Sequence, residues 1–302
     1  MQTPYDVIIL GGSYAGLSAA MSLGRAIKTV LVIDNGKPCN QQTPYSHNFL
    51  SRDGQAPQEI SEISKAQVAN YGSVNFVDDT AVHAQKTDEG LVIETKNGKK
   101  FHGKKLIIAS GVRDEMPNID GFAECWGITV IHCPYCHGYE VRNQRTGIFA
   151  NGDIAHEFSK LIWNWSKALT IFTNGKSTLT ADQTSELKAK GIVIDEREIV
   201  KITHNNGKLE ALKFSDGSTL QLDALYAKIP FTQNSTIAEE LGCEMTAHGH
   251  ILVDNMQKTS VDNVFACGDS TTMMRSVANA VHGGNLAGAA VSRELIAAEF
   301  NS

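Results

Sequence analysis

The chain has 302 residues, is 42% hydrophobic and carries a formal net charge of −6, so it is long enough for two domains with cores of their own. It contains no apolar run near the roughly 20 residues of a membrane span, and residues 7–10 are too short a stretch for a signal peptide. It also lacks a run of Lys or Arg that would neutralise a row of phosphates. We therefore expect a cytoplasmic protein with neither a membrane nor a nucleic acid as its partner.

The N-terminal segment has the pattern of a strand, a glycine turn and a helix. Residues 5–10 form the strand, Gly11–Gly16 the turn, and small and apolar residues continue to about Ile27. A second buried strand, 29–33, closes on Asp34. This βαβ pattern is typical of a dinucleotide site, in which amides at the helix N-terminus bind the pyrophosphate and the acidic residue binds a ribose.

One position in this turn departs from the usual pattern. Gly11 and Gly16 match the first and third glycines, but Ser13 stands where the second is usual. An ordinary strand–helix turn of an α/β domain is the alternative interpretation of this segment.

The next segments predict more strands. Residues 74–101 are rich in alternating and β-branched residues, with Asn97-Gly98 as a hairpin turn, and predict a small antiparallel meander. Residues 106–111 predict another buried strand that ends on the small residues Ala109, Ser110 and Gly111.

A second strand–turn–helix–strand unit follows. Its parts are a strand at 147–150, the turn Asn151–Asp153, a helix at about 154–167 and a strand at 169–173. Further strands are predicted at 192–194, 209–214 and 224–228, and a final helix begins near Val277. The chain therefore has two units that resemble nucleotide-binding domains.

Near the C-terminus, residues 265–269 join a short strand to Gly268 and Asp269. In flavoproteins with two dinucleotide domains, such an acidic residue binds the ribityl or phosphate end of FAD. A lone Gly-Asp would more often be a plain turn. Together with the first glycine turn and residues 109–111, it predicts one FAD site assembled from distant segments.

Only one pair among the six cysteines, Cys133 and Cys136, is close in sequence. Two intervening residues hold the thiols close enough for a strained, reducible disulfide and lower the pKa of one thiol. Pro134 suits the first turn of a helix, whose N-terminus favours a thiolate. In a reducing cytoplasm such a pair is catalytic, redox-sensing or metal-binding.

Two other uses of this motif compete with redox chemistry. His132, Cys133, Cys136 and His137 could be taken for zinc ligands, but adjacent His and Cys rarely share one ion and no second Cys-x-x-Cys completes a site. Residues 133–137 also spell the C-x-x-C-H haem attachment motif, which belongs to exported proteins. We therefore expect no bound metal. His137 is the acid/base candidate, because an imidazole can exchange a proton with a thiol near neutral pH; a solvated histidine at a helix end is the alternative.

Taken together, these features resemble the low-molecular-weight thioredoxin reductase family over nearly the whole chain. The closest resemblance is to its thioredoxin reductase-like branch, which includes the gliotoxin- and holomycin-type dithiol oxidases, and it is carried by GGSYAG at 11–16 and CPYCHGYE at 133–140. It implies an α/β fold with two Rossmann-like three-layer dinucleotide-binding domains, the second inserted into the first. The FAD-binding domain would comprise 1–113 and 230–302, and the inserted domain, 114–229, would carry the cysteine pair and a nicotinamide site.

The resemblance also implies that Cys136 faces the flavin, that Cys133 attacks the substrate disulfide, and that the protein is a homodimer. Thioredoxin reductases have an acidic residue where this chain has His137. Asn48 matches an asparagine near the isoalloxazine ring, and residues 275–277 match a flavin-contacting Arg-Gln-Ala. The predicted cofactor contacts are Gly11, Ser13, Tyr14, Ala15, Gly16, Asp34, Asn48, Ala109, Ser110, Gly111, Gly268, Asp269, Arg275, Ser276 and Val277.

The second nucleotide turn departs from the family pattern. Its first glycine is lost, and the candidate nicotinamide contacts are Asn151, Gly152, Asp153, Ile154 and Ala155. The next strand leads into residues 173–175, where NADPH-using members carry an arginine pair for the 2′-phosphate. The carboxylate of Asp153 would also repel a pyrophosphate. Three alternatives follow for the nicotinamide site. It binds NADPH poorly, it uses NADH instead, or it binds no nicotinamide at all.

The leading hypothesis is electron exchange between FAD and a Cys133/Cys136 disulfide, followed by thiol–disulfide exchange with a thioredoxin-like protein or a small-molecule disulfide or dithiol. A dithiol oxidase that passes electrons through the flavin to oxygen is the first alternative. A non-catalytic flavin-binding redox sensor is an alternative of another class.

Overall fold

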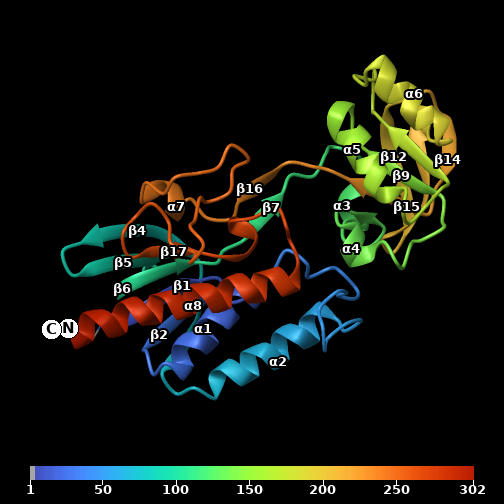
Figure 1. Cartoon of the computed structure of the whole chain (residues 1–302). Coiled ribbons are helices and arrows are strands. Elements are labelled where there is room, and N and C mark those ends of the chain that lie inside the picture. The colour runs from blue at the N-terminus through green and yellow to red at the C-terminus, as the bar shows by residue number, and fades with distance from the viewer. Residues whose placement is uncertain (1–3) are drawn as a thin grey trace. The chain divides into compact units, whose positions relative to one another are not determined.

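In a computed structural model, the described part of the chain, residues 4–302, divides into two units (Figure 1). The first unit contains the chain up to Gln41, Asn48–Arg113 and Phe231–Ser302. The second contains Gln42–His47 and Asp114–Pro230, and so interrupts the first. Residues 1–3 of the predicted first domain lie outside the described residues.

The first unit is built on a seven-stranded sheet in the order β3-β2-β1-β6-β5-β4, with β17 also paired to β6. Strands β3, β2, β1, β6 and β17 are parallel, whereas β6, β5 and β4 are antiparallel. Buried apolar residues of β1 alternate between two cores, one on each face of the sheet, which is why this strand is apolar throughout. The bounds are β1 Tyr5–Leu10, β2 Val30–Asp34, β3 Val74–Asp78, β4 Ala81–Thr87, β5 Gly90–Thr95, β6 Lys100–Ile108 and β17 Val264–Ala266.

The predicted meander is only partly right. The Asn97-Gly98 turn is confirmed, since the Gly98 amide donates to the Thr95 carbonyl at 2.8 Å between β5 and β6. Strand β3, however, pairs in parallel with β2 instead of joining the hairpins, because the chain crosses from β2 to β3 through the helix at 57–69, a connection that suits parallel strands. The strand predicted at 106–111 is the second half of β6 and ends at Ile108.

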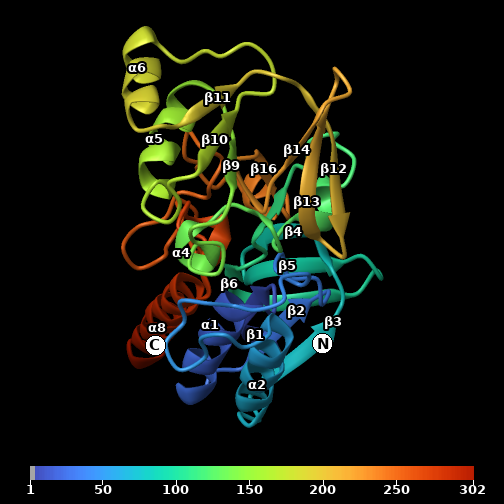
Figure 2. The ribbon, with the colours of Figure 1, turned by 90° about the vertical axis from the view of Figure 1, so that its right-hand side faces the viewer.

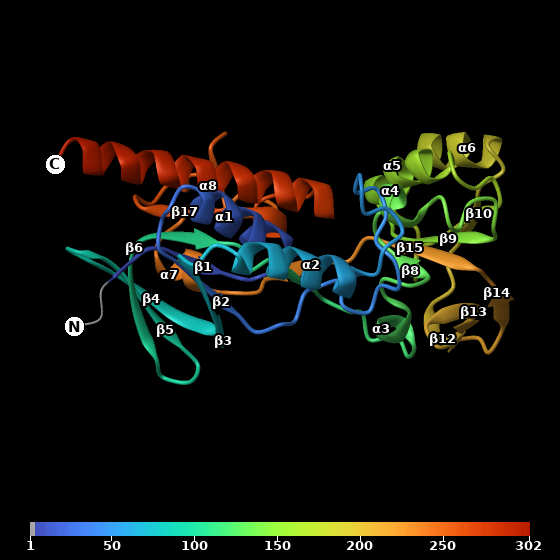
Figure 3. The same ribbon diagram turned by 90° about the horizontal axis from the view of Figure 1, so that it is seen from below.

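Helices cover one face of this sheet, and α1 lies beside α8 along much of its length (Figure 3). Their contact is backbone to backbone: a Cβ on Gly284 would lie 2.0 Å from the Ala15 carbonyl oxygen, and one on Gly288 would lie 2.7 Å from the Ala19 carbonyl oxygen. The remaining elements of this unit are α1 Tyr14–Arg25, α2 Pro57–Ala69, α7 Ile237–Glu240, the 3₁₀ helix η1 Gly268–Ser270, α8 Val277–Phe300 and the strand pair β7 Val112–Asp114 and β16 Phe231–Gln233.

The second unit has a parallel sheet in the order β11-β10-β9-β15-β8, with a three-stranded antiparallel sheet, β12-β13-β14, on one side and α5 and α6 on the other (Figure 2). Its elements are α3 Phe122–Cys125, β8 Val130–Ile131, α4 Pro134–His137, β9 Thr146–Phe149, α5 Gly152–Ile162, β10 Leu169–Phe172, α6 Ala181–Ala189, β11 Val193–Asp195, β12 Ile199–Asn205, β13 Lys208–Phe214, β14 Thr219–Gln221 and β15 Ala224–Ala227. The predicted fold class, α/β with two Rossmann-like layered units, is confirmed.

One prediction in the second unit needs correction. The helix predicted to reach Lys167 ends at Ile162, and beyond its end the Ser166 hydroxyl donates to the Gln144 carbonyl at 2.7 Å, a contact that a continued helix does not provide for. The strand predicted at 209–214 is confirmed as part of β13, in the antiparallel sheet. Within residues 4–302, no helix combines the length and hydropathy that crossing a bilayer requires.

The α1–α8 contact predicts a contrast between two adjacent glycines. Gly284→Ala should lower the free energy of unfolding by about 1–3 kcal/mol, since its Cβ would overlap the backbone of α1. Gly283→Ala is the matched control, because its Cβ would meet no atom closer than 3.5 Å, and the gain in helix propensity of up to about 1 kcal/mol should dominate. Urea unfolding of both variants measures the difference; equal stabilities would contradict the close approach.

Candidate redox and dinucleotide sites

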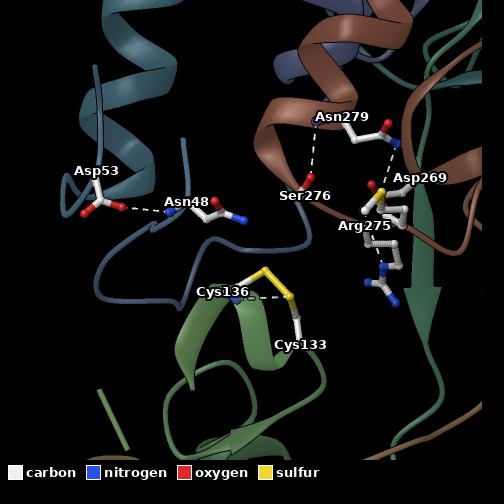
Figure 4. Close-up of a disulfide and its surroundings, with 9 residues drawn as sticks. Asn48, Asp53, Cys133, Cys136, Asp269, Arg275, Ser276 and Asn279 are labelled. Carbon is white, nitrogen blue, oxygen red and sulfur yellow. Dashed lines mark hydrogen bonds and ion pairs between the residues drawn. A yellow bond between two sulfur atoms is a disulfide. The ribbon is translucent and has the colours of Figure 1, made fainter. Parts of the chain in front are cut away.

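The cysteine pair lies where a strand passes into a short helix. Cys133 is the N-cap of α4, Pro134 is at the first helical position, and the Cys136 amide donates to the Cys133 sulfur at 3.2 Å. The two sulfurs form a disulfide, with the Cα atoms 5.3 Å apart (Figure 4). Two thiols joined in this way are not available as zinc ligands, so the geometry favours redox chemistry over the zinc alternative.

The packing beneath α4 explains why Gly138 follows the pair. A Cβ on Gly138 would lie 2.4 Å from the Pro134 carbonyl oxygen and 3.0 Å from the Trp165 ring. Tyr135 meets the same Trp165 edge-on, with the ring centroids 5.5 Å apart, yet 60% of its surface stays exposed. The disulfide therefore lies beside a packed aromatic pair, and Cys133 and Cys136 are each half-buried.

The other cysteines differ from this pair in reactivity. Burial raises the pKa of Cys125 to about 11 and that of Cys267 to about 12, and it also raises the pKa of Cys243. These three thiols stay protonated near neutral pH and are poor nucleophiles. Cys39 is exposed, with its sulfur 3.8 Å from a carboxylate oxygen of Asp269.

His137 is half-buried at the end of α4. Burial lowers its pKa, the Glu140 carboxylate opposes this by raising the pKa, and His47 lowers it further. The imidazole is therefore neutral near neutral pH and able to accept a proton. Our sequence interpretation included Glu140 in the motif at 133–140 but gave a role to neither Glu140 nor His47; the spacing of three residues between His137 and Glu140 was a signal for the first of them.

The first glycine turn requires its glycines because backbone approaches backbone. A Cβ on Gly11 would lie 2.3 Å from the Ala109 carbonyl oxygen, and one on Gly16 would lie 1.8 Å from the Gly11 carbonyl oxygen. Gly11 also has a φ of 102°, which side chains disfavour. Ser13 is the N-cap of α1 and makes no capping hydrogen bond with its side chain, so its hydroxyl is not committed to the helix.

The side chains around this turn fasten it to the sheet. Asp34 accepts hydrogen bonds from the Gly12 amide at 2.9 Å and the Gly36 amide at 3.1 Å, which ties the end of β2 to the turn. Tyr14 is buried and donates to the Pro57 carbonyl at 3.2 Å. The Asp34 carboxylate thus has a structural role in addition to the ribose contact predicted for it.

Three of the predicted FAD segments meet at one edge of the parallel sheet. The strands β1, β6 and β17 are adjacent and parallel, so Gly11, residues 109–111 and residues 268–269 follow their carboxyl ends. A Cβ on Gly268 would lie 2.8 Å from the Ala15 Cβ, which brings η1 against α1. The buried hydroxyls of Ser110 and Ser270 have no hydrogen-bond partner, and such groups call for a ligand or a water. The residues at this edge fit a bound dinucleotide.

The remaining predicted contacts belong to the same unit but are held by local partners. The backbone amide of Asn48 donates to the Asp53 carboxylate at 2.7 Å, and the Arg275 guanidinium lies 3.4 Å from the Asp269 carboxylate (Figure 4). Ser276 is the N-cap of α8 and accepts from the Asn279 amide at 3.2 Å. Val277 is the first residue of α8 and packs against the core under α1.

The second turn is closed by the protein's own chain. The Asn151 side-chain oxygen accepts from the amides of Gly152, at 2.8 Å, and Thr178, at 2.9 Å, while its amide group donates to the Lys176 carbonyl at 3.0 Å. A Cβ on Gly152 would lie 2.7 Å from the Thr178 hydroxyl oxygen. Residues 176–178 thus lie directly over the turn.

The other residues of this turn do not improve the fit to a nicotinamide dinucleotide. Asp153 places a carboxylate in the first turn of α5 and accepts from the Gln183 side chain at 2.8 Å. Ile154 is exposed, and Ala155 is buried in the core. Because a loop and a carboxylate stand where a pyrophosphate would bind, the second turn does not fit one.

Comparison with known proteins gives a consistent result. A family model described as pyridine nucleotide-disulphide oxidoreductase matches residues 5–284. The chain is 34% identical to thioredoxin reductase tcpT of Claviceps purpurea, over 97% of this chain and 94% of the relative. Among solved structures, an oxidoreductase from Agrobacterium tumefaciens is 37% identical with a TM-score of 0.90, covering 97% of this chain and 99% of that one. A putative thioredoxin reductase TrxB from Bacillus anthracis is 32% identical with a TM-score of 0.93, covering 98% and 100%.

The closed turn predicts a local effect of Asn151→Ala. Loss of the side-chain oxygen removes the acceptor of the Gly152 and Thr178 amides, so both should exchange with deuterium faster, with a cost of about 0.5–2 kcal/mol for the lost cap. Thr180→Ala, which removes the cap of α6, is the control and should leave these two amides protected. Unchanged exchange at Thr178 in the Asn151 variant would show that the loop is held by other contacts.

Proposed function

We propose that the chain catalyses thiol–disulfide exchange at Cys133 and Cys136, and that each of the two cysteines has its own role. The chain belongs to the pyridine nucleotide-disulphide oxidoreductase family. The chain is a flavoprotein disulfide oxidoreductase of the thioredoxin reductase-like kind, which passes electrons between FAD and this disulfide. The disulfide at the start of α4 is the observation that carries the proposal.

In the proposed roles, Cys133 reacts with the substrate and Cys136 exchanges electrons with the flavin. In the reduced protein, neutral His137 takes the proton of the Cys133 thiol, and the resulting thiolate attacks one sulfur of the substrate disulfide. The substrate bond breaks, and the leaving thiolate takes that proton back from His137. The Cys136 thiolate then attacks the Cys133 sulfur of the mixed disulfide and releases the second substrate thiolate. Two electrons thus pass to the substrate, and the Cys133–Cys136 bond forms again; a dithiol substrate runs through the same steps in reverse.

FAD would be held by the edge at which β1, β2, β6 and β17 end. Backbone amides at the α1 N-terminus would bind the pyrophosphate, Asp34 a ribose, and Asp269 the ribityl chain. Bound there, the flavin supplies an acceptor and donor of electron pairs. The supporting observations are the glycine-dependent approach of the turn to Ala109 and the unpartnered hydroxyls of Ser110 and Ser270.

A second candidate, an oxygen-dependent dithiol oxidase, is favoured by the closed second turn. Residues 176–178 and the Asp153 carboxylate stand where a nicotinamide dinucleotide would place its pyrophosphate. Electrons would then enter the Cys133–Cys136 pair from a small dithiol and leave through the flavin to oxygen. A small-molecule dithiol is therefore our proposed substrate class, ahead of a thioredoxin-like protein.

The setting of this reaction is also a proposal. Cys125, Cys243 and Cys267 are free thiols, as a reducing cytoplasm would keep them. A homodimer follows from the family resemblance and is tested by light scattering on the purified protein.

Serine substitutions test the roles of the two cysteines. Both Cys133→Ser and Cys136→Ser should retain bound flavin but lose turnover of dithiols and disulfides to below roughly a hundredth of the wild-type rate, because the exchange needs both sulfurs. Cys39→Ser, at an exposed cysteine outside the pair, is the control and should turn over normally. Full activity of the Cys133 variant would reject the proposal in favour of a site elsewhere, and the absence of turnover in the wild type would favour the redox sensor.

Anaerobic mixing separates the two candidate functions. We expect a small dithiol such as dithiothreitol to bleach the visible absorbance of the flavin, and NADH and NADPH to bleach it far more slowly, because the second turn does not fit a pyrophosphate. Admitting oxygen should restore the colour. Rapid bleaching by either nicotinamide would overturn the oxidase candidate and support a reductase.

A further inference from the structure

A cluster of titratable side chains lies beside the redox pair in the second unit. His137 ends α4, Glu140 follows it by three residues, and the Nε2 atom of His47 lies 3.6 Å from the Oε1 atom of Glu140. Glu140 raises the pKa of His137 and His47 lowers it, so both are within electrostatic reach of the imidazole. The carboxylate therefore stands in contact with one histidine and acts on the other.

His47 is brought to this place by a segment that is distant in sequence. Residues 42–47 belong to the second unit although the chain on both sides of them belongs to the first. The Gln42 side chain donates to the Trp126 carbonyl at 2.9 Å, and the Thr43 hydroxyl lies 2.8 Å from where a Cβ on Gly127 would be. These contacts anchor the segment and hold His47 against Glu140.

The cluster also has a buried side. The hydroxyl of Tyr226, a fully buried residue of β15, has no hydrogen-bond partner, and Glu140 is the charged group that acts on it. Glu140 thus contacts His47 from the 42–47 segment and acts electrostatically on His137 from α4 and Tyr226 from β15. The groups facing His137 are Glu140 and His47.

We propose that Glu140 is a positioning residue that stabilises the protonated form of His137 while the Cys133–Cys136 disulfide is being reduced, and that His47, in contact with Glu140, opposes this effect. This inference rests on the proposed function of the pair. It assigns the proton-handling step to His137 together with a carboxylate that contacts His47, and not to His137 alone.

A dithiol substrate would reduce the Cys133–Cys136 disulfide in two exchange steps. One substrate thiol gives its proton to His137, the resulting thiolate attacks the Cys133 sulfur, and the Cys133–Cys136 bond breaks with Cys136 leaving as a thiolate. The second substrate thiol transfers its proton to the Cys136 thiolate and attacks the substrate sulfur of the mixed disulfide, so that Cys133 leaves as a thiolate. The substrate loses two electrons and two protons, the pair gains the electrons, and the imidazolium of His137 lies beside the Glu140 carboxylate.

The test measures the pKa of His137 directly, by NMR titration of the flavin-loaded, full-length protein labelled at the histidine rings. His137→Gln identifies the resonance. Glu140→Gln should lower the proton affinity of His137 by roughly three- to tenfold because the carboxylate is removed, and His47→Gln should raise it because an opposing histidine is removed. A merely structural role would not move the two variants in opposite directions.

The same variants are then compared in the anaerobic reduction of the disulfide by dithiothreitol, followed by alkylation to count free thiols across pH. The acid limb of the rate profile should move to lower pH in Glu140→Gln and to higher pH in His47→Gln, while Glu140→Asp should restore most of the wild-type profile. Glu124→Gln, at an exposed carboxylate of α3 in the same unit, is the control and should change neither measurement.

The outcomes distinguish this inference from the function on which it rests. If the His137 titration is the same in wild type, Glu140→Gln and His47→Gln, while all three turn over, the inference is overturned and the proposed function stands. If dithiols do not reduce the wild-type disulfide, the proposed function fails and the proposed role of Glu140 fails with it. Opposite shifts in the titration, matched by opposite shifts in the rate profile, support the inference.

Discussion

The backbone of α1 is approached from two sides more closely than any Cβ would permit. Gly16 within the helix meets the Gly11 carbonyl, and Gly284 of α8 meets the Ala15 carbonyl. This double contact fixes the glycine turn between the ends of β1 and β6, and it places η1 against the first turn of the same helix. The dinucleotide edge of the first unit exists because small residues let these backbones meet.

The two units use the same strand–turn–helix plan with different results. In the first, Asp34 is bonded to the turn from the neighbouring strand, and the hydroxyl of the helix cap, Ser13, is left uncommitted. In the second, the cap residue Asn151 takes up the amides of Gly152 and Thr178 and draws a loop over the helix end. One helix N-terminus thus fits an anion, whereas the other has its polar groups satisfied by its own chain.

Local patterns predicted local structure well. The first βαβ segment, the N-cap position of Cys133 with Pro134 after it, and the start of α8 near Val277 were all evident from residue type and spacing. Strand pairing across long separations was not evident. We assigned β3 to the hairpins because the residue pattern of a strand does not show which strand it pairs with.

Contacts that depend on tertiary structure were also beyond the sequence. The turns after α5 are tied by a hydrogen bond from Ser166 to Gln144, a residue that precedes the helix in the chain. His47 is separated from Glu140 by most of the first unit's sheet along the chain, so no spacing rule could have joined them.

Segment 42–47 has a consequence for protein engineering: an excised piece covering only 114–230 would leave this segment behind and expose the surface of Trp126 and Gly127 that it covers. Domain exchange between relatives must therefore transplant two separate pieces of chain to preserve the surroundings of the disulfide.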